Sequence, residues 1–175
     1  HTLYLSKLVG NGFVIAYEPQ RLVFQNLCAN LALNSISNVF AYQEAVSNEN
    51  GTIIIPECNF KENNNFGGIN IENTKNGTTV NKQKLDNFLN KIDRLKLLKI
   101  DVEGMEILVI KGAKELIDKF RPIIFGAIKL YNNLSSFRRY NEIIPWWKII
   151  TLRSEKPSVV ITWFFLFVKI LLFWD

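Results

Sequence analysis

The stretch that decides the fold runs from Leu97 to Ala113 and reads LLKIDVEGMEILVIKGA. Its apolar start belongs to a run from Leu95 to Ile100, which is typical of a strand buried on both faces. An amphipathic helix follows directly, and its apolar face carries Met105, Leu108, Val109, Gly112 and Leu116. Asp101 and Glu103 stand between the two elements. Because ionised carboxylates are almost never buried without a partner, we expect them either to cap this helix or to face a ligand.

Short apolar strands alternate with helical segments on both sides of this stretch. Predicted strands cover residues 13–19, Val39–Gln43, Thr52–Ile55 and Ile123–Ile128. Predicted helices cover residues 3–9, 20–34 and 84–92. Residues 57–81 are rich in Asn, Gly and Lys and are predicted to form a long loop. This alternation predicts an α/β fold with a mainly parallel sheet covered by helices on both faces.

The composition indicates a globular protein. The chain has 175 residues, of which 48% are hydrophobic and 21% charged, enough for a domain with a full core. Its formal net charge of +5 comes from scattered basic residues, so we expect no nucleic-acid partner. The two cysteines, Cys28 and Cys58, form neither a disulfide framework nor a zinc-binding spacing. This pattern fits a reducing compartment, and we expect a cytoplasmic protein.

Histidine is nearly absent, which restricts the chemistry. The single histidine is His1. Catalytic triads with a histidine base and metal sites with histidine ligands are therefore not expected, and we predict no metal ion. The choice of a general base is therefore narrow, and three acids, Glu18, Glu44 and Asp101, stand where predicted strands end. Because ligands of such sheets bind at the carboxyl ends of the strands, we expect these three acids at the ligand-binding edge.

Three parts of the chain resemble the FkbM-type methyltransferases. They are VIAYEPQRLVFQNLCANLALNSISNVFAYQEAVSNENGTI (14–53), NFGGINI (65–71), and KLDNF (84–88) together with LKLLKIDVEGMEILVIKGAKELI (95–117). The resemblance extends from about Thr2 to Phe125. It implies a Rossmann-like three-layer α/β/α fold and an enzyme that depends on S-adenosylmethionine. Characterised members of the family methylate hydroxyl oxygens, so the implied acceptor is a hydroxyl on a sugar, a glycan or another small metabolite.

The resemblance also implies which residues hold the cofactor. Glu18, followed by Pro19, falls where the family binds the ribose hydroxyls, and a carboxylate at a strand end can accept two such hydrogen bonds. Glu44 and Ala45 fall where related enzymes contact the adenine. From the residues alone, Glu18 could instead be an acid favoured by the helix dipole, and Glu44 a solvated acid at a strand end.

The family's DVEG motif implies the place of methyl transfer. Asp101 and Glu103 match this motif beside the cofactor, and either carboxylate would act as general base for the acceptor hydroxyl. Asn65, Gly67 and Gly68 match a glycine loop that lets the backbone approach the substrate. Helix capping is the structural alternative for the two acids, and a flexible surface turn is the alternative for the loop.

The chain departs from the family pattern at both ends. The glycine-rich turn that holds the methionine part of the cofactor belongs upstream of HTLYLSKL (1–8), so we expect a fold that is truncated at its N-terminus. We divide the chain into a partial methyltransferase domain, 1–128, and a divergent apolar tail, 129–175. Lys169 interrupts the most apolar part of the tail, so membrane association through it is possible but not favoured.

Two other functions remain open on the sequence. A different Rossmann-like enzyme, such as a dinucleotide-dependent oxidoreductase, would also place an acid where Glu18 stands. An inactive, membrane-associated remnant would account for the apolar tail and the missing glycine turn. None of the motifs specifies the acceptor, because acceptor specificity usually lies in variable loops.

Overall fold

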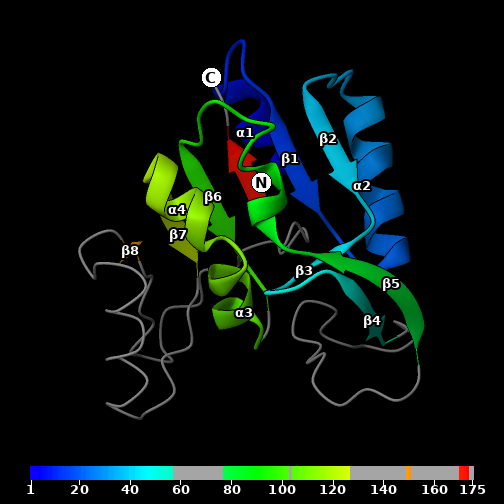
Figure 1. The fold of residues 1–175 in the computed structure, drawn as a ribbon. Coiled ribbons are helices and arrows are strands. Elements are labelled where there is room, and N and C mark those ends of the chain that lie inside the picture. The colour runs from blue at the N-terminus through cyan, green and yellow to red at the C-terminus, as the bar shows by residue number, and fades with distance from the viewer. Residues whose placement is uncertain (57–76, 103, 127–148, 151–169, 174–175) are drawn as a thin grey trace, which may run out of the picture.

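The chain folds around a six-stranded sheet, with a smaller three-stranded sheet at one edge (Figure 1). The computed structural model describes residues 1–56, 77–102, 104–126, 149–150 and 170–173. The strands of the main sheet are β1 (Val14–Tyr17), β2 (Val39–Tyr42), β6 (Leu97–Ile100), β7 (Ile123–Gly126), β8 (Ile149–Ile150) and β9 (Ile170–Phe173). Their order across the sheet is β2–β1–β9–β6–β7–β8. The predicted strands that became β1, β2, β6 and β7 are therefore confirmed.

β9 gives the main sheet a mixed character. β1 pairs in parallel with β2, as do β6 with β7 and β7 with β8, but β9 lies antiparallel between β1 and β6. Leu172 of β9 pairs with Ile15 on one side and with Leu98 on the other. The predicted α/β fold is confirmed, and most pairings in the main sheet are parallel as predicted, whereas the two pairings of β9 at its centre are antiparallel. An apolar strand from far along the chain fills the position between two apolar, buried strands.

Two helices, α1 (Thr2–Leu8) and α2 (Arg21–Leu33), pack on one face of the main sheet. Val23, Leu27 and Leu31 recur every four residues along α2 and are buried, as their spacing predicts. Leu27 and Leu31 belong to the same apolar cluster as residues of α1, β1 and β2. Figure 1 shows α2 alongside β2, at one end of the main sheet.

Three short helices pack on the opposite face. They are the 3-10 helix η1 (Leu85–Phe88), α3 (Glu106–Lys111) and α4 (Lys114–Phe120). Their apolar side chains share a core with Ile15 and Tyr17 of β1 and with Leu98 and Ile100 of β6. Side chains of β1 and β6 thus enter one core on this face and another on the face of α2, because side chains alternate along a strand.

Gly112 divides the helix that the sequence predicts as a single element from Met105 to Leu116. A Cβ atom at this position would lie 2.0 Å from the backbone carbonyl oxygen of Ser47, so the chain passes closer there than any side chain allows. The backbone carbonyl of Gly112 also accepts a hydrogen bond of 2.9 Å from the N–H of Asp86. This contact between distant segments ends α3 and starts α4, and periodicity within the helix does not reveal it.

The small sheet contains β3 (Ala45–Val46), β5 (Thr78–Gln83) and β4 (Gly51–Ile55), in this order. β4 confirms the predicted strand near residue 52. β5 was missed, and its start overlaps the predicted loop, because its sequence TTVNKQ buries only Val80 and has no apolar run. Figure 1 shows the small sheet at the edge of the main sheet to which β1, β2 and β6 point.

β8 and β9 come from the segment that the sequence assigns to the tail, and both lie in the main sheet. The division of the chain at residue 128 stays a prediction. In the described part of the chain, no helix is both long enough and apolar enough to cross a membrane.

Candidate functional site

Glu18 and Asp101 follow strands that end at the same edge of the main sheet. β1 and β6 run in one direction because both are antiparallel to β9, and Tyr17 and Ile100 both pair with Ile170. Each acid is the next residue after its strand, so the two leave the sheet at the same level. Since neighbouring strands lie about 4.8 Å apart, the two backbones are about 10 Å apart at this level.

Glu18 is fully buried at the end of β1. Its Oε1 accepts a hydrogen bond of 2.8 Å from the backbone N–H of Gln20, the N-cap residue of α2. The backbone N–H of Glu18 donates to the carbonyl oxygen of Tyr42 at 3.0 Å, which extends the pairing of β1 with β2. Pro19, between the two, is also buried. The carboxylate therefore lies near the N-terminus of α2, where the helix dipole favours negative charge.

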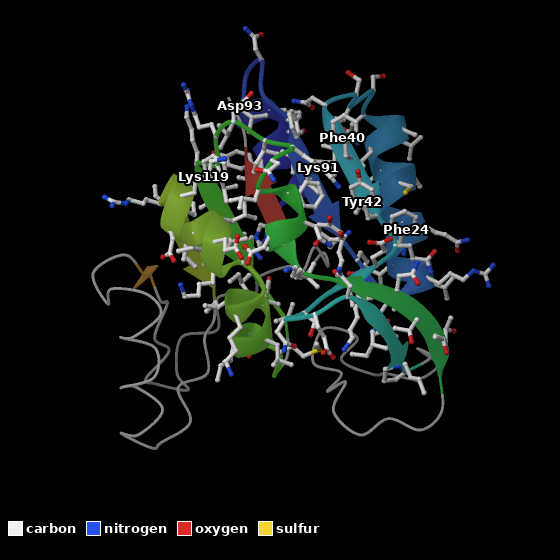
Figure 2. All side chains as sticks on the ribbon, in the orientation of Figure 1. Phe24, Phe40, Tyr42, Lys91, Asp93 and Lys119 are labelled. Carbon is white, nitrogen blue, oxygen red and sulfur yellow. The ribbon has the colours of Figure 1, made fainter. Side chains whose placement is uncertain are left out.

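Glu44 belongs to a network that joins the two sheets. Nε2 of Gln83, in β5, donates to Oε2 of Glu44 at 2.6 Å and to the hydroxyl oxygen of Tyr17 at 3.0 Å. The ring of Tyr17 stacks on that of Tyr42, which projects from β2 (Figure 2), with centroids 5.3 Å apart. Burial first, and then the charges of Tyr42 and Glu44, raise the pKa of Tyr17 well above its ordinary value. Ala45, the next residue along the chain, is buried at the start of β3.

Asp101 pairs with a buried lysine. Lys99 and Asp101 are two residues apart at the end of β6, so their side chains leave the strand on the same face. Nζ of Lys99 is 2.5 Å from Oδ2 of Asp101. The side chain of Lys99 is 6% exposed and that of Asp101 is 42% exposed. Burial and then the charge of Lys99 lower the pKa of the N-terminal ammonium of His1, so the start of α1 lies near this pair.

Asp101 does not cap α3. The N-cap residue of this helix is Met105, and no side chain caps it. Between β6 and α3 the chain turns at Gly104, whose φ of +81° favours glycine. The N–H of Gly104 points to Oε1 of Glu106 at 3.4 Å, a long hydrogen bond. Of the two alternatives for Asp101, capping is therefore not what the structure shows.

Comparison with known proteins identifies the family of this chain. The family described as "Methyltransferase FkbM domain" matches residues 1–153, which is most of the chain. The chain belongs to the FkbM methyltransferase family. The resemblance noted in its sequence is thereby confirmed. No solved structure matches this FkbM domain.

Two curated relatives of the FkbM domain carry methyltransferase names. "Methyltransferase sdnD" of Sordaria araneosa is 27% identical, over 65% of this chain and 56% of the relative. "Methyltransferase 1" of Beauveria bassiana (strain ARSEF 2860) is 26% identical, over 63% of this chain and 53% of the relative. The chain thus spans about half the length of the curated relatives it matches.

Three polar residues of this region were not part of the site predicted from the sequence. Lys99 is buried beside Asp101, and a charged residue within the apolar run LLKI could have indicated a functional position. Gln83 orients Glu44 but comes from the polar strand β5, which gave no such signal. Glu106 is buried in the first turn of α3 of the FkbM domain, directly after Met105.

The remaining predicted site residues are not placed by the structure. Glu103, Asn65, Gly67 and Gly68 lie outside the described residues. Within the described ranges, no three residues among His, Cys, Asp and Glu gather closely enough to hold a metal ion.

Proposed function

We propose that this FkbM domain transfers a methyl group from S-adenosylmethionine to a hydroxyl oxygen of a sugar, a glycan or another small metabolite. The observation that carries the proposal is that Glu18, Glu44 and Asp101 follow β1, β2 and β6, three strands that run in one direction in one sheet. Ligands of α/β sheets bind at this edge. We further propose that the helices on the two faces of the sheet form the layers of a Rossmann-like α/β/α fold.

The chemistry of these acids suits the proposed cofactor. A carboxylate at the end of β1 is the acceptor that a pair of ribose hydroxyls needs, and Glu18 provides one. Glu44, which Gln83 already orients, can accept a hydrogen bond from the exocyclic amine of adenine. Because Glu18 is fully buried, its proposed role requires that binding displaces the atoms that now cover it.

Asp101 is the proposed general base. When bound, S-adenosylmethionine supplies a methyl group on a positively charged sulfur, which an oxygen nucleophile can attack. The half-exposed carboxylate of Asp101 would take the proton that the acceptor hydroxyl loses as its oxygen bonds to the methyl carbon and the bond from that carbon to sulfur breaks. The other residues of the edge act by holding the reactants in line, which is the main contribution of the protein to such a displacement.

Calorimetry with S-adenosylhomocysteine tests this proposal in the whole chain. We expect the parent chain to bind it and Glu18→Ala to weaken binding by about tenfold or more, because charge-assisted hydrogen bonds contribute about 1.5–3 kcal/mol. Glu115→Ala is the matched control, since Glu115 is also an acid near a helix N-terminus but is exposed on α4.

Two results would contradict the proposal. Equal affinities in Glu18→Ala and the parent, with thermal melts showing both folded, would remove Glu18 from the cofactor site. Binding of a nicotinamide dinucleotide in place of S-adenosylhomocysteine would instead support the oxidoreductase alternative. Transfer of radiolabelled methyl groups to methyl α-glucoside, a simple sugar with free hydroxyls, then tests the acceptor class.

A further inference from the structure

Lys99 is an unusual residue for the middle of a sheet. It stands in β6 between Leu98 and Ile100, which are fully buried, and is itself only 4% exposed. The residues that pair with it across the sheet, Phe125 of β7 and Leu171 of β9, are apolar. Lysine is almost never fully buried unless it is paired. The position therefore has the surroundings of an apolar side chain but carries a charge.

Stability does not account for this charge. Moving an ammonium group out of water costs free energy, and an ion pair often regains no more than a well-packed apolar residue of similar volume would contribute. Residues that break the local pattern in this way concentrate at functional positions. The group on which Lys99 acts is the carboxylate of Asp101, through the contact of 2.5 Å between Nζ and Oδ2.

We infer that Lys99 is a positioning residue that sets the carboxylate of Asp101 for proton transfer. The ammonium group of Lys99 is buried and contacts Oδ2 of Asp101. The side chain of Asp101, which follows the end of β6, is 42% exposed. Fixing one oxygen from the interior also fixes the direction of the other. Lys99 itself would touch neither reactant. The inference rests on the proposed function of Asp101 as general base.

A second lysine–aspartate pair provides the comparison. Nζ of Lys114 is 2.9 Å from Oδ2 of Asp118, one helical turn further along α4. Both side chains are about equally exposed, at 60% and 59%, so solvent screens this pair. Burial of the cation, rather than the presence of a pair, is thus what distinguishes Lys99.

A double-mutant cycle in the whole chain tests the inference, with Lys99→Met, Asp101→Asn, the double variant and the control Lys114→Met. Thermal melts establish folding, and calorimetry measures affinity for S-adenosylhomocysteine. Label transfer from S-adenosylmethionine to methyl α-glucoside gives kcat and KM. For Lys99→Met we expect near-parental affinity and KM but a kcat lower by about 10²-fold, the cost of a misplaced catalytic group. The double variant should be no slower than Asp101→Asn alone, and Lys114→Met should match the parent.

The outcomes separate this inference from the proposed function. Parental kcat in Lys99→Met, or losses that multiply in the double variant, would overturn the inference while leaving S-adenosylhomocysteine binding intact. If Lys99→Met fails to fold, Lys99→Arg replaces it: retaining the charge should keep most of kcat, and a loss as large as that of Asp101→Asn would overturn the inference. If the parent binds no S-adenosylhomocysteine or transfers no label, the proposed function fails and the inference fails with it.

Discussion

At the scale of single residues, Tyr17 shows how burial sets the state of a side chain. Its ring lies between Tyr42, which stacks on it, and Phe88, which meets it edge-on at 6.5 Å. Its hydroxyl accepts a hydrogen bond from Gln83. In this environment the phenolate is disfavoured, mainly because burial removes it from water. Tyr17 therefore serves the network around Glu44 as a neutral group.

This burial predicts a dependence of stability on alkaline pH. In the unfolded chain, Tyr17 ionises near the ordinary tyrosine pKa of about 10, whereas the folded chain holds the proton to higher pH. The folded state then binds more protons, so the stability that Tyr17 contributes is present below about pH 10 and lost as pH rises above it. Tyr17→Phe should reduce the free energy of unfolding by about 0.5–1.5 kcal/mol at neutral pH, through the lost hydrogen bond, and by less at higher pH.

Urea unfolding at a series of pH values measures this difference. Tyr4→Phe is the control, because Tyr4 lies on α1 and is 67% exposed. Parallel curves for Tyr17→Phe and the parent would show that Tyr17 is not protected from ionisation by the fold.

At the scale of the elements, Asp86 joins two helices. Its Oδ1 accepts a hydrogen bond of 2.9 Å from the backbone N–H of Leu116, in the first turn of α4, although Asp86 itself lies in η1. The residue before α4, Ala113, makes no side-chain cap, so Asp86 provides the side-chain acceptor for this end of the helix.

Asp86→Ala should therefore lower the free energy of unfolding by about 0.5–2 kcal/mol, as the loss of a helix cap does, whereas Asp86→Asn should cost less. Chemical denaturation checks this against Asp93→Ala, an exposed aspartate (Figure 2). Equal effects of the two alanine variants would exclude the capping role.

The same contacts explain how far the sequence predicts this structure. Apolar runs predicted β1, β2, β4, β6 and β7, and the four-residue spacing predicted α2, because both signals are local. The break at Gly112 and the strand β5 were missed, since the first depends on Ser47 and the second on its pairing with β3 and β4. At the candidate site, Gln83 escaped prediction for the same reason, because its partner Glu44 lies far away in the sequence. Lys99 lies only two residues from its partner Asp101, but its burial is defined by the fold.

At the scale of the whole molecule, β9 connects the two halves of the main sheet. On one side β9 pairs with β1, and β2 lies next to β1. On the other side β9 pairs with β6, and β7 and then β8 lie beyond β6.

Proline at position 171 would remove a backbone donor from this central strand and fix its φ. We therefore expect Leu171→Pro to abolish cooperative unfolding or lower the midpoint strongly, whereas Leu171→Val, which favours strands, should change it little. Circular dichroism during urea titration measures both. An unchanged midpoint in Leu171→Pro would show that β9 is dispensable for the sheet.

The antiparallel insertion of β9 also has a consequence for synthesis on the ribosome. Val14 pairs with Phe173, so the partners are 173 − 14 = 159 positions apart. Contacts between such distant positions form slowly, because a long loop must close before they contribute. Until residues 170–173 have left the ribosomal tunnel, one edge of β1 and one edge of β6 are without their partner strand. Nascent chains of this protein are therefore expected to depend on chaperones that cover apolar strand edges, and to aggregate when translation is fast relative to their supply.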